Sequence, residues 1–185
     1  MLSYVFWHWP HAGVDSGRYE SAQRAFHADL AASPPAGFLG SSCHRVIGAG
    51  WAAGGGPAYE DWYLLENSAA LDELNTAAVS AARRTVHDQV AGMAAGGTAG
   101  LYQLEIGRHL PSATTAVWFG KPAGWSYARL TEVVRPVVEA SRASLWMRRM
   151  VLGPSPEFCI RAHGPVPLPA ELSAVSIPLS PVWPS

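Results

Sequence analysis

YESAQRAFHADLAAS, residues 19–33, and YARLTEVVRPVVEAS, residues 127–141, are two equally long segments of one chain. Both begin with tyrosine after a turn-like stretch, and both end in Ala-Ser before an apolar, strand-like run. Two matching helices in one chain indicate an internal duplication. Their apolar side chains lie at helical spacing, and they are Tyr19, Ala22, Phe26 and Leu30 in the first segment and Leu130, Val133, Val134, Val137 and Val138 in the second.

The stretches around the first segment have the pattern of a ferredoxin-like unit. Strand-like runs are predicted at residues 2–9, 38–47, 59–66 and 101–106, with helices at 16–33 and from Ser68 to about Gly92. Gly96-Gly97 is the latest point at which the second helix can end. The order β-α-β-β-α-β is that of a split βαβ unit.

Around the second segment the same order returns in a shortened form. Strands are predicted at residues 115–120, 145–152, 157–162 and 175–179, with a helix at 125–141. Three prolines before Glu171 leave room for only a short turn of helix there. We therefore predict an α+β fold of two tandem ferredoxin-like halves, residues 1–110 and 111–185. Their antiparallel sheets are expected to pack as an α+β barrel and to form one compact domain.

Composition narrows the classes of partner. Of 185 residues, 49% are hydrophobic and 15% are charged, and the formal net charge is -1. Lys121 is the only lysine and the arginines are scattered, which argues against a nucleic-acid surface. No apolar run approaches the roughly 18 residues of a membrane span, and the N-terminal sequence lacks the basic region of a signal peptide. Cys43 and Cys159 fit buried thiols of a reducing compartment. We expect a cytoplasmic monomer or homodimer that binds a small apolar or aromatic molecule.

In its element order and repeated landmarks, the chain resembles the dimeric α+β barrel superfamily. That group includes antibiotic-biosynthesis-monooxygenase-like proteins, small haem-degrading enzymes and stress-response barrel proteins. The resemblance is architectural, extends over nearly the whole chain and includes no signature of catalytic residues. Since the barrel of that superfamily usually forms from two chains, the resemblance implies that a tandem duplication lets one chain form it alone.

Two short motifs do not keep their usual meaning in this sequence. GAGWAA at residues 48–53 fits a dinucleotide-binding turn, but GGGP at 54–57 forbids the helix that must follow, so we predict a loop. His8 and His11 are three residues apart, yet Pro10 prevents the helical geometry that would direct both side chains at one metal. We predict no metal site from this pair.

Nucleophilic catalysis is not indicated either. Cys43 and His44 are adjacent on a predicted strand, so their side chains point to opposite faces and cannot form a thiol–base pair. Ser41-Ser42 lacks the G-x-S-x-G elbow of hydrolases, and the H-E-x-x-H and P-loop motifs do not occur.

Polar side chains share strand faces with aromatic ones. We hypothesise that these mixed faces line a cavity inside the barrel, where aromatic side chains enclose an organic ligand and polar ones orient it. The opposite face, with Val5, Trp7 and Trp9, is predicted to pack on the helices. A plain sheet interface stays open as the alternative. The mixed faces carry Tyr4, Phe6 and His8; Ser42 and His44; Tyr59, Asp61 and Tyr63; Met147 and Arg149; and Cys159 and Arg161.

Three functions follow as alternatives. The first is a monooxygenase-like enzyme without a built-in cofactor, using His8 or His44 as a general base on an aromatic or polyketide-like compound. The second is a non-catalytic ligand-binding or assembly module. The third is a haem-binding protein, because Trp62 and His87 loosely resemble the placement of a tryptophan and a haem-ligating histidine in the small haem-degrading barrels.

Overall fold

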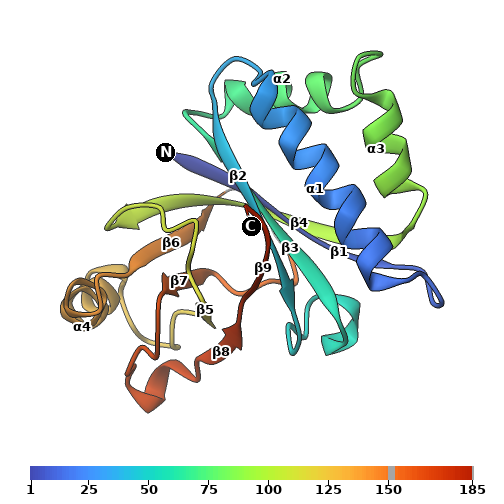
Figure 1. Ribbon diagram of the computed structural model, residues 1–185. Helices are drawn as coiled ribbons and strands as arrows, with labels where there is room; N and C mark the ends of the chain where they lie inside the picture. The colour runs from blue at the N-terminus through green and yellow to red at the C-terminus, as the bar shows by residue number, and fades with distance from the viewer. Residues whose placement is uncertain (150–152, 185) are drawn as a thin grey trace.

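The computed structural model describes residues 1–149 and 153–184 (Figure 1). The first part of the chain contains β1 (Leu2–Pro10), α1 (Ser16–Ala32), β2 (Phe38–Val46), η1 (Ala53–Gly55), β3 (Ala58–Leu65), α2 (Ala69–Ala78), α3 (Arg84–Ala91) and β4 (Ala94–Ile106). The second part contains β5 (Thr115–Phe119), α4 (Tyr127–Ala140), β6 (Ser144–Arg149), β7 (Phe158–Ala162), η2 (Ala170–Leu172), β8 (Val175–Pro178) and β9 (Ser180–Trp183). The strand predicted at 145–152 is described as far as Arg149, because residues 150–152 lie outside the described part.

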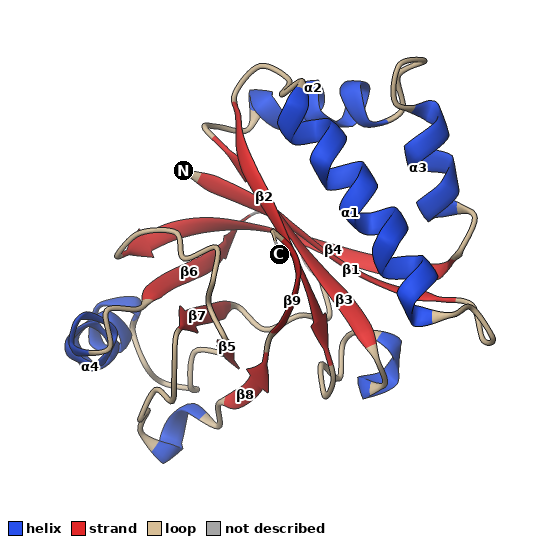
Figure 2. Ribbon diagram, in the orientation of Figure 1, coloured by secondary structure: helices blue, strands red, loops and turns tan. Residues whose placement is uncertain are grey.

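All nine strands belong to one sheet with the order β8-β5-β7-β6-β4-β1-β3-β2-β9, and the paired strands are antiparallel. β8 pairs with β5 at one edge, and β9 pairs with β2 at the other. Only Leu179 separates β8 from β9, so the two edges meet within about 7 Å. The C-terminal segment therefore closes the sheet into a barrel (Figure 2).

The helices lie outside this barrel. α1, α2 and α3 cover the outer face of the strands β1 to β4, and α4 covers the second half of the sheet (Figure 2). Local capping explains where two of them begin, because the Asp15 side chain accepts the backbone N–H of Arg18 at 2.8 Å and the Ser126 hydroxyl accepts that of Arg129 at 3.1 Å. The first cap is Asp15, one residue before the predicted Ser16.

The single helix predicted from Ser68 to about Gly92 is wrong, since the segment forms two helices, α2 and α3. An unbroken helix of that length would run roughly 36 Å, past the end of a strand such as β3, which spans roughly 26 Å. The turn between α2 and α3 is tied to α1, because the guanidinium Nε of Arg83 lies 2.7 Å from the Asp29 carboxylate. The break therefore returns α3 along α1 and keeps both helices over the sheet.

Two strand predictions also change. β4 begins at Ala94 and includes Gly96 and Gly97, so it starts seven residues before the strand predicted at 101–106. The edge strand predicted at 175–179 is confirmed as β8, but a further strand that was not predicted, β9, follows it and lies at the opposite edge of the sheet. Both differences arise because these segments pair with strands that are distant in the sequence. The local pattern of apolar and polar residues gives no information about such pairing.

Tryptophans fill the interior of the barrel. The Trp7 and Trp118 ring centroids are 5.3 Å apart, and those of Trp62 and Trp146 are 5.0 Å apart; all four side chains are fully buried. This corrects the predicted strand faces, because Val5 and Trp7 point into the barrel and not toward the helices. The interior is a packed core.

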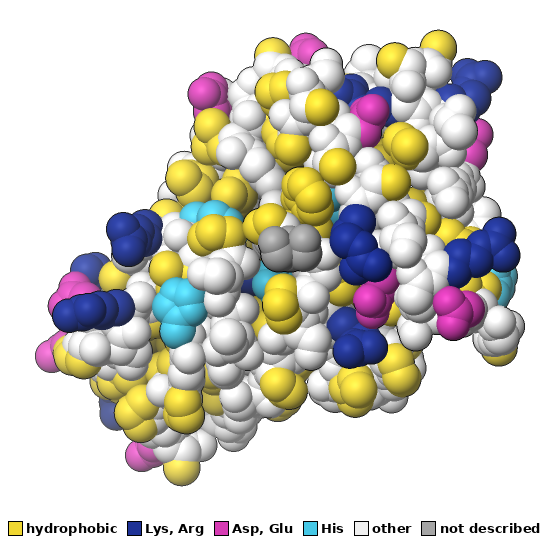
Figure 3. Space-filling view, in the orientation of Figure 1, with side chains coloured by type: hydrophobic (Ala, Val, Ile, Leu, Met, Phe, Trp, Pro, Cys, Tyr) yellow, Lys and Arg dark blue, Asp and Glu magenta, His cyan; other side chains and the backbone are white. Residues whose placement is uncertain are grey.

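Among the described residues, no helix is long and apolar enough to cross a bilayer. On the face of the molecule in Figure 3, basic side chains are scattered among acidic and apolar ones and form no single patch.

Candidate active site

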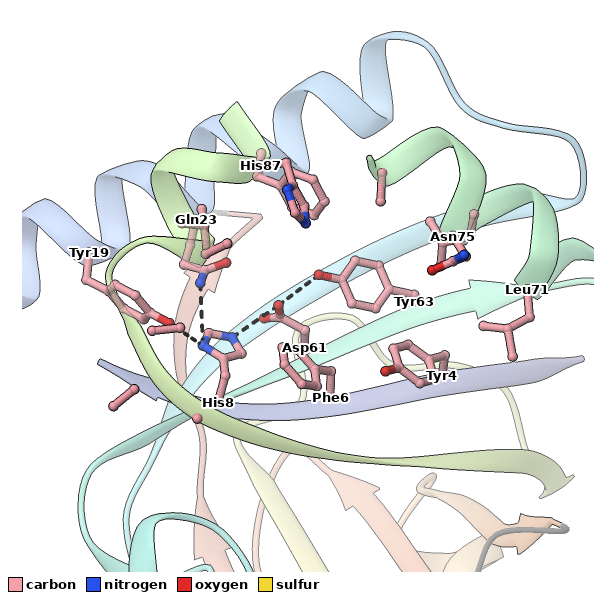
Figure 4. Close-up of a pocket in the computed structure, with 18 of the residues that line it drawn as sticks. Tyr4, Phe6, His8, Tyr19, Gln23, Asp61, Tyr63, Leu71, Asn75 and His87 are labelled. Atoms are coloured by element: carbon pink, nitrogen blue, oxygen red, sulfur yellow. Dashed lines mark hydrogen bonds and ion pairs between the residues drawn. The ribbon is translucent and has the colours of Figure 1, made fainter. Parts of the chain in front are cut away.

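A cavity of about 660 Å³ lies between the sheet and the first three helices (Figure 4). Its floor comes from β1, β3 and β4, and its walls come from α1, α2 and α3. A cavity of roughly 300–1,000 Å³ with many apolar and a few polar side chains is typical of binding sites for small organic molecules. The polar side chains that line it are those of Tyr4, His8, Tyr19, Gln23, Asp61, Tyr63, Asp72, Asn75 and His87.

Strand alternation explains the floor of the cavity. Successive side chains of β1 point to opposite faces, so those of Tyr4, Phe6 and His8 lie beneath the helices while Val5 and Trp7 enter the barrel. The mixed face is therefore real, but it lines a cavity on the helix side of the sheet. The antiparallel register sets these residues opposite β3, with the pairs Tyr4–Tyr63, Phe6–Asp61 and His8–Tyr59.

Gly97 on β4 makes room for the Phe6 ring. A Cβ atom at Gly97 would lie 2.5 Å from both Cε2 and Cζ of Phe6 and 3.0 Å from the Trp7 carbonyl oxygen. Such distances are too short for van der Waals contact, so any side chain at this position would displace the ring. The glycines of β4 thus determine the shape of the cavity floor.

Hydrogen bonds connect His8 to helix α1 and to strand β3 (Figure 4). The imidazole Nδ1 lies 2.7 Å from the Tyr19 hydroxyl, and Nε2 lies 3.2 Å from Oδ2 of Asp61. The amide of Gln23 lies 3.5 Å from the same Nδ1. With Nε2–H donated to the carboxylate, Nδ1 accepts the tyrosine proton. Tyr19, His8 and Asp61 therefore form a chain along which a proton can move.

Asp61 is a buried carboxylate shared by two histidines. Burial alone would raise its pKa, but the interactions with His8 and then with His27 outweigh burial and hold the pKa well below the usual range. Tyr63 also donates its hydroxyl to Oδ2 of Asp61 at 2.9 Å. The carboxylate is thus ionised and orients His8, which is the part a carboxylate plays in a catalytic triad.

Tyr19 keeps its proton in this arrangement. Burial raises its pKa first, and the nearby Asp61 charge adds to the effect. The side chain lines the cavity while its hydroxyl contacts His8. A substrate group in the cavity can therefore exchange a proton with His8 through the tyrosine hydroxyl.

The structure divides the predicted site residues among three places. Tyr4, Phe6, His8, Asp61 and Tyr63 line the cavity under the helices. His44 and Arg161 lie on the opposite side of the sheet, inside the barrel, because His44 pairs with Glu60 in the register and not with Asp61. Met147 and Arg149 line a second cavity of about 460 Å³ beside α4. The expected convergence of His8, His44, Asp61 and Arg149 on one volume is therefore wrong.

Inside the barrel, the buried charges are already paired. Arg161 donates to Oε1 of Glu60 at 3.2 Å, and its guanidinium lies 4.6 Å from the Trp62 ring centroid. The indole N–H groups of Trp7 and Trp62 also donate to Glu60, at 2.9 and 2.6 Å. Burial and then the Arg161 charge lower the pKa of His44 to about 3. This group has the contacts of a core network, in which Arg161 Nε alone among the named donors makes no hydrogen bond.

Three residues of α1 at the site were not predicted as site residues, and one of them, Tyr19, was assigned to the apolar stripe of the helix. Tyr19, Gln23 and His27 follow each other at intervals of four, so they form one polar stripe beside the apolar stripe of the same helix. His27 is fully buried and stacks on Tyr63, with ring centroids 5.4 Å apart. The i, i+4, i+8 spacing of these three residues was the feature of the sequence that could have predicted them as site residues.

The residues around the cavity do not fit haem. His87 lines the cavity and its Nδ1 pairs with Asp88 at 3.0 Å, which leaves Nε2 available. Trp62, however, faces the barrel interior on the other side of the sheet. Haem propionates need cationic partners, whereas the described lining contains Asp61 and Asp72 and neither lysine nor arginine. His11, the other histidine of the first motif, is exposed in a turn.

Comparison with solved structures shows that the chain shares an α+β barrel fold with proteins of known structure. A monooxygenase-like protein from Lactobacillus acidophilus NCFM matches with a TM-score of 0.59 and 11% identity over 98% of this chain and 94% of its own. An anthrone oxidase-like protein matches with a TM-score of 0.54 and 7% identity, over 97% and 90% of the two chains. A chlorite dismutase-like protein matches with a TM-score of 0.52 and 9% identity, over 97% and 94%. No protein-family model and no curated protein matches the sequence. At these identities the matches show the fold alone.

Proposed function

We propose that the chain is a small-molecule-binding α+β barrel built from two tandem ferredoxin-like units, residues 1–110 and 111–185. The strands of the first unit have the order β4-β1-β3-β2, and those of the second have the order β8-β5-β7-β6. Each is the order 4-1-3-2 when its own strands are counted from one, which supports the proposal of a duplicated unit. A helical turn, η2, stands where the second helix of the second unit would be.

The activity that best suits the cavity is the oxygenation of an aromatic or polyketide-like compound without a cofactor. The observation that carries this proposal is the Tyr19–His8–Asp61 chain at the floor of an aromatic cavity. Fold likeness to monooxygenase-like and anthrone oxidase-like proteins agrees with this reaction class. Tyr4, Phe6 and Tyr63 would contact the rings of the substrate.

In this reaction His8 acts as the general base. As Tyr19 takes a proton from an acidic carbon or phenol of the substrate, it passes its own proton to Nδ1 of His8, and the Asp61 carboxylate stabilises the imidazolium. The electron-rich substrate anion then combines with O₂. For a methylene group the balance is CH₂ + O₂ → C=O + H₂O, so no further reductant or oxidant is needed.

Anthrone in aerated buffer tests this proposal, with O₂ uptake and anthraquinone formation as readouts. We expect His8→Gln to lower kcat by about 10²–10⁴-fold, the usual contribution of a general base. His44→Gln, which changes a histidine on the other face of the sheet, serves as the control and should retain activity. Circular dichroism checks the fold of both variants.

Two outcomes would contradict the assignment. Equal turnover by His8→Gln and the unchanged protein would remove His8 as the base. Binding of anthrone in equilibrium dialysis without turnover by the unchanged protein would instead favour the non-catalytic ligand-binding module.

A further inference from the structure

Three side chains with metal-binding atoms converge just beneath helix α1. They are His27 from α1, Cys43 from β2 and Asp61 from β3, and one donor atom of each lies within 4.8 Å of the others. All three side chains are buried, with relative exposures of 0%, 0% and 1%. The register explains two of them, because Cys43 and Asp61 are direct partners across β2 and β3 and share the helix-facing side.

Two of these atoms have no hydrogen-bond partner among the described residues. His27 Nε2 and Asp61 Oδ1 are both buried and make no hydrogen bond, and they face each other at 3.4 Å, within ion-pair distance. Leaving such groups unsatisfied costs roughly 1–3 kcal/mol each. A nitrogen and an oxygen bound to one tetrahedral Zn²⁺ at about 2.0–2.1 Å are separated by about 3.3 Å. The observed spacing is therefore close to that of two ligands of one metal.

The remaining atoms of the same side chains are fixed by hydrogen bonds. His27 Nδ1 lies 2.8 Å from the Ser41 hydroxyl, so that donation of Nδ1–H leaves the Nε2 lone pair free. Oδ2 of Asp61 accepts from Tyr63 at 2.9 Å and contacts His8 at 3.2 Å. Metal-ligating histidines and carboxylates are held by outer partners in this way.

The ring of His27 cannot easily turn away from this point. It stacks between Tyr63, at 5.4 Å between centroids, and Trp183, at 6.4 Å. Trp183 of β9 is the register partner of Cys43, so the strand that closes the barrel also covers the cluster. The three donor atoms are thus held in place by helix, sheet and C-terminal strand together.

We propose that His27 Nε2, Cys43 Sγ and Asp61 Oδ1 form a zinc site. Nitrogen, thiolate and carboxylate are the ligands that Zn²⁺ takes in proteins, and three protein ligands leave a fourth position open. A thiolate ligand disfavours Mg²⁺ and Ca²⁺, which prefer oxygen. A sulfur and an oxygen on one zinc lie about 3.6 Å apart, so the distance from Cys43 Sγ to Asp61 Oδ1, at most 4.8 Å here, shortens by no more than about 1.2 Å on binding. The site uses Oδ1 of Asp61, whereas His8 uses Oδ2, and its test is independent of the proposed oxygenation.

Cobalt provides the experiment, because Co²⁺ replaces Zn²⁺ and its spectrum reports cysteine ligation. Untagged protein is stripped with a chelator, titrated with Co²⁺ under reducing conditions and then challenged with Zn²⁺. We expect one equivalent of Co²⁺ to bind with a sulfur-to-cobalt charge-transfer band and visible bands of four-coordinate cobalt. One equivalent of Zn²⁺ should remove both.

Two matched variants separate the two buried cysteines. Cys43→Ser should lose the charge-transfer band, whereas Cys159→Ser should retain it, because Cys159 is equally buried but belongs to the barrel core. Ser41→Ala keeps all three ligands and should weaken the affinity by about 10–100-fold. Absence of a charge-transfer band with the unchanged protein would overturn the proposal without any variant. Retention of the band in Cys43→Ser, or its loss in Cys159→Ser alone, would overturn it as well.

Discussion

Asp61 is the residue at which the two proposals meet. One carboxylate oxygen orients His8 toward the cavity, and the other lies beside His27. A single buried carboxylate between two imidazoles needs both for its charge to be tolerated, because an unpaired buried charge costs several kcal/mol. Asp61 therefore links the floor of the cavity to the cluster under α1. Substitutions of His8 and of His27 are expected to have effects that do not simply add.

His109 makes the folded state sensitive to acid. Burial, and then the charge of Arg161, lower its pKa from 6.5 to about 4. The unfolded chain binds a proton as the pH falls through about 6.5, whereas the folded chain stays neutral until about pH 4, so stability is lost across this window. His109→Gln should reduce this loss in the free energy of unfolding by at most about 1.4 kcal/mol per pH unit. Urea unfolding near pH 7 and near pH 5 measures the difference.

His163→Gln is the control for this measurement, since His163 is exposed after β7. An unchanged acid dependence in His109→Gln would show that the buried imidazole does not contribute. His44, whose pKa is lowered to about 3, acts in the same direction and accounts for acid sensitivity that remains.

The alternation of residues along β1 predicts which side chains form the cavity floor, but not which side of the sheet the cavity lies on. Alternation grouped Tyr4, Phe6 and His8 correctly, yet it could not tell which face meets the helices. Every residue of β3 is buried, so neither face carries the polar signal of solvent that normally distinguishes them. Trp7 and Trp62 also do not reveal which face meets the helices. Their indole N–H groups donate to the buried carboxylate of Glu60, a contact that exists only in the folded chain.

At the element scale, β4 controls the width of the cavity through its glycines. A methyl group at Gly97 would push the Phe6 ring toward the cavity. Overpacking of this kind costs about 1–3 kcal/mol, so Gly97→Ala should lower stability by that amount and weaken anthrone binding about tenfold. Urea unfolding and equilibrium dialysis measure the two effects.

Gly120→Ala is the matched substitution, because nothing lies within 4 Å of a Cβ atom there. If Gly97→Ala bound anthrone as tightly as Gly120→Ala, the ring would have moved away from the cavity and the role given to β4 would be wrong.

Elements with strong local signals were predicted well. Helices α1 and α4 and strands β1, β2, β3, β5 and β7 lie within a few residues of their predicted bounds. The predictions that were wrong concern segments whose structure is set by contacts with residues far away in the sequence. At the break between α2 and α3, Arg83 contacts Asp29 of the distant helix α1, and the glycine-rich start of β4 pairs with β1.

At the scale of the whole molecule, the C-terminal segment turns a sheet into a barrel. β8 pairs along the edge of β5 and β9 pairs with Cys43 to Arg45 at the edge of β2, so both edges are at least partly covered by the C-terminal segment. Short, proline-containing strands carry little local signal, which is why the sequence suggested one edge strand and not a closure. β9 also brings Trp183 over His27, so closure of the barrel and geometry of the cluster depend on the same residues.

Leu179 is the residue on which this closure depends most. It joins β8 to β9, its side chain is 5% exposed in the barrel core, and its backbone N–H donates to the Thr114 carbonyl at 2.9 Å. Leu179→Ala removes buried methyl groups at the seam without changing the backbone, so we expect a loss of about 2–5 kcal/mol in the free energy of unfolding. Val175→Ala, in the same segment but 46% exposed, should change it by less than about 0.5 kcal/mol.

Hydrogen exchange distinguishes an open seam from a general loss of stability. If the barrel opens at its seam, amides of β2 and β9 in Leu179→Ala should exchange faster than those of β6 and β7, because only the former lose their neighbours when the C-terminal strand detaches. Uniform acceleration through all strands would mean that the core is weakened as a whole. The seam would then not be an independent unit, and closure would be inseparable from folding of the barrel.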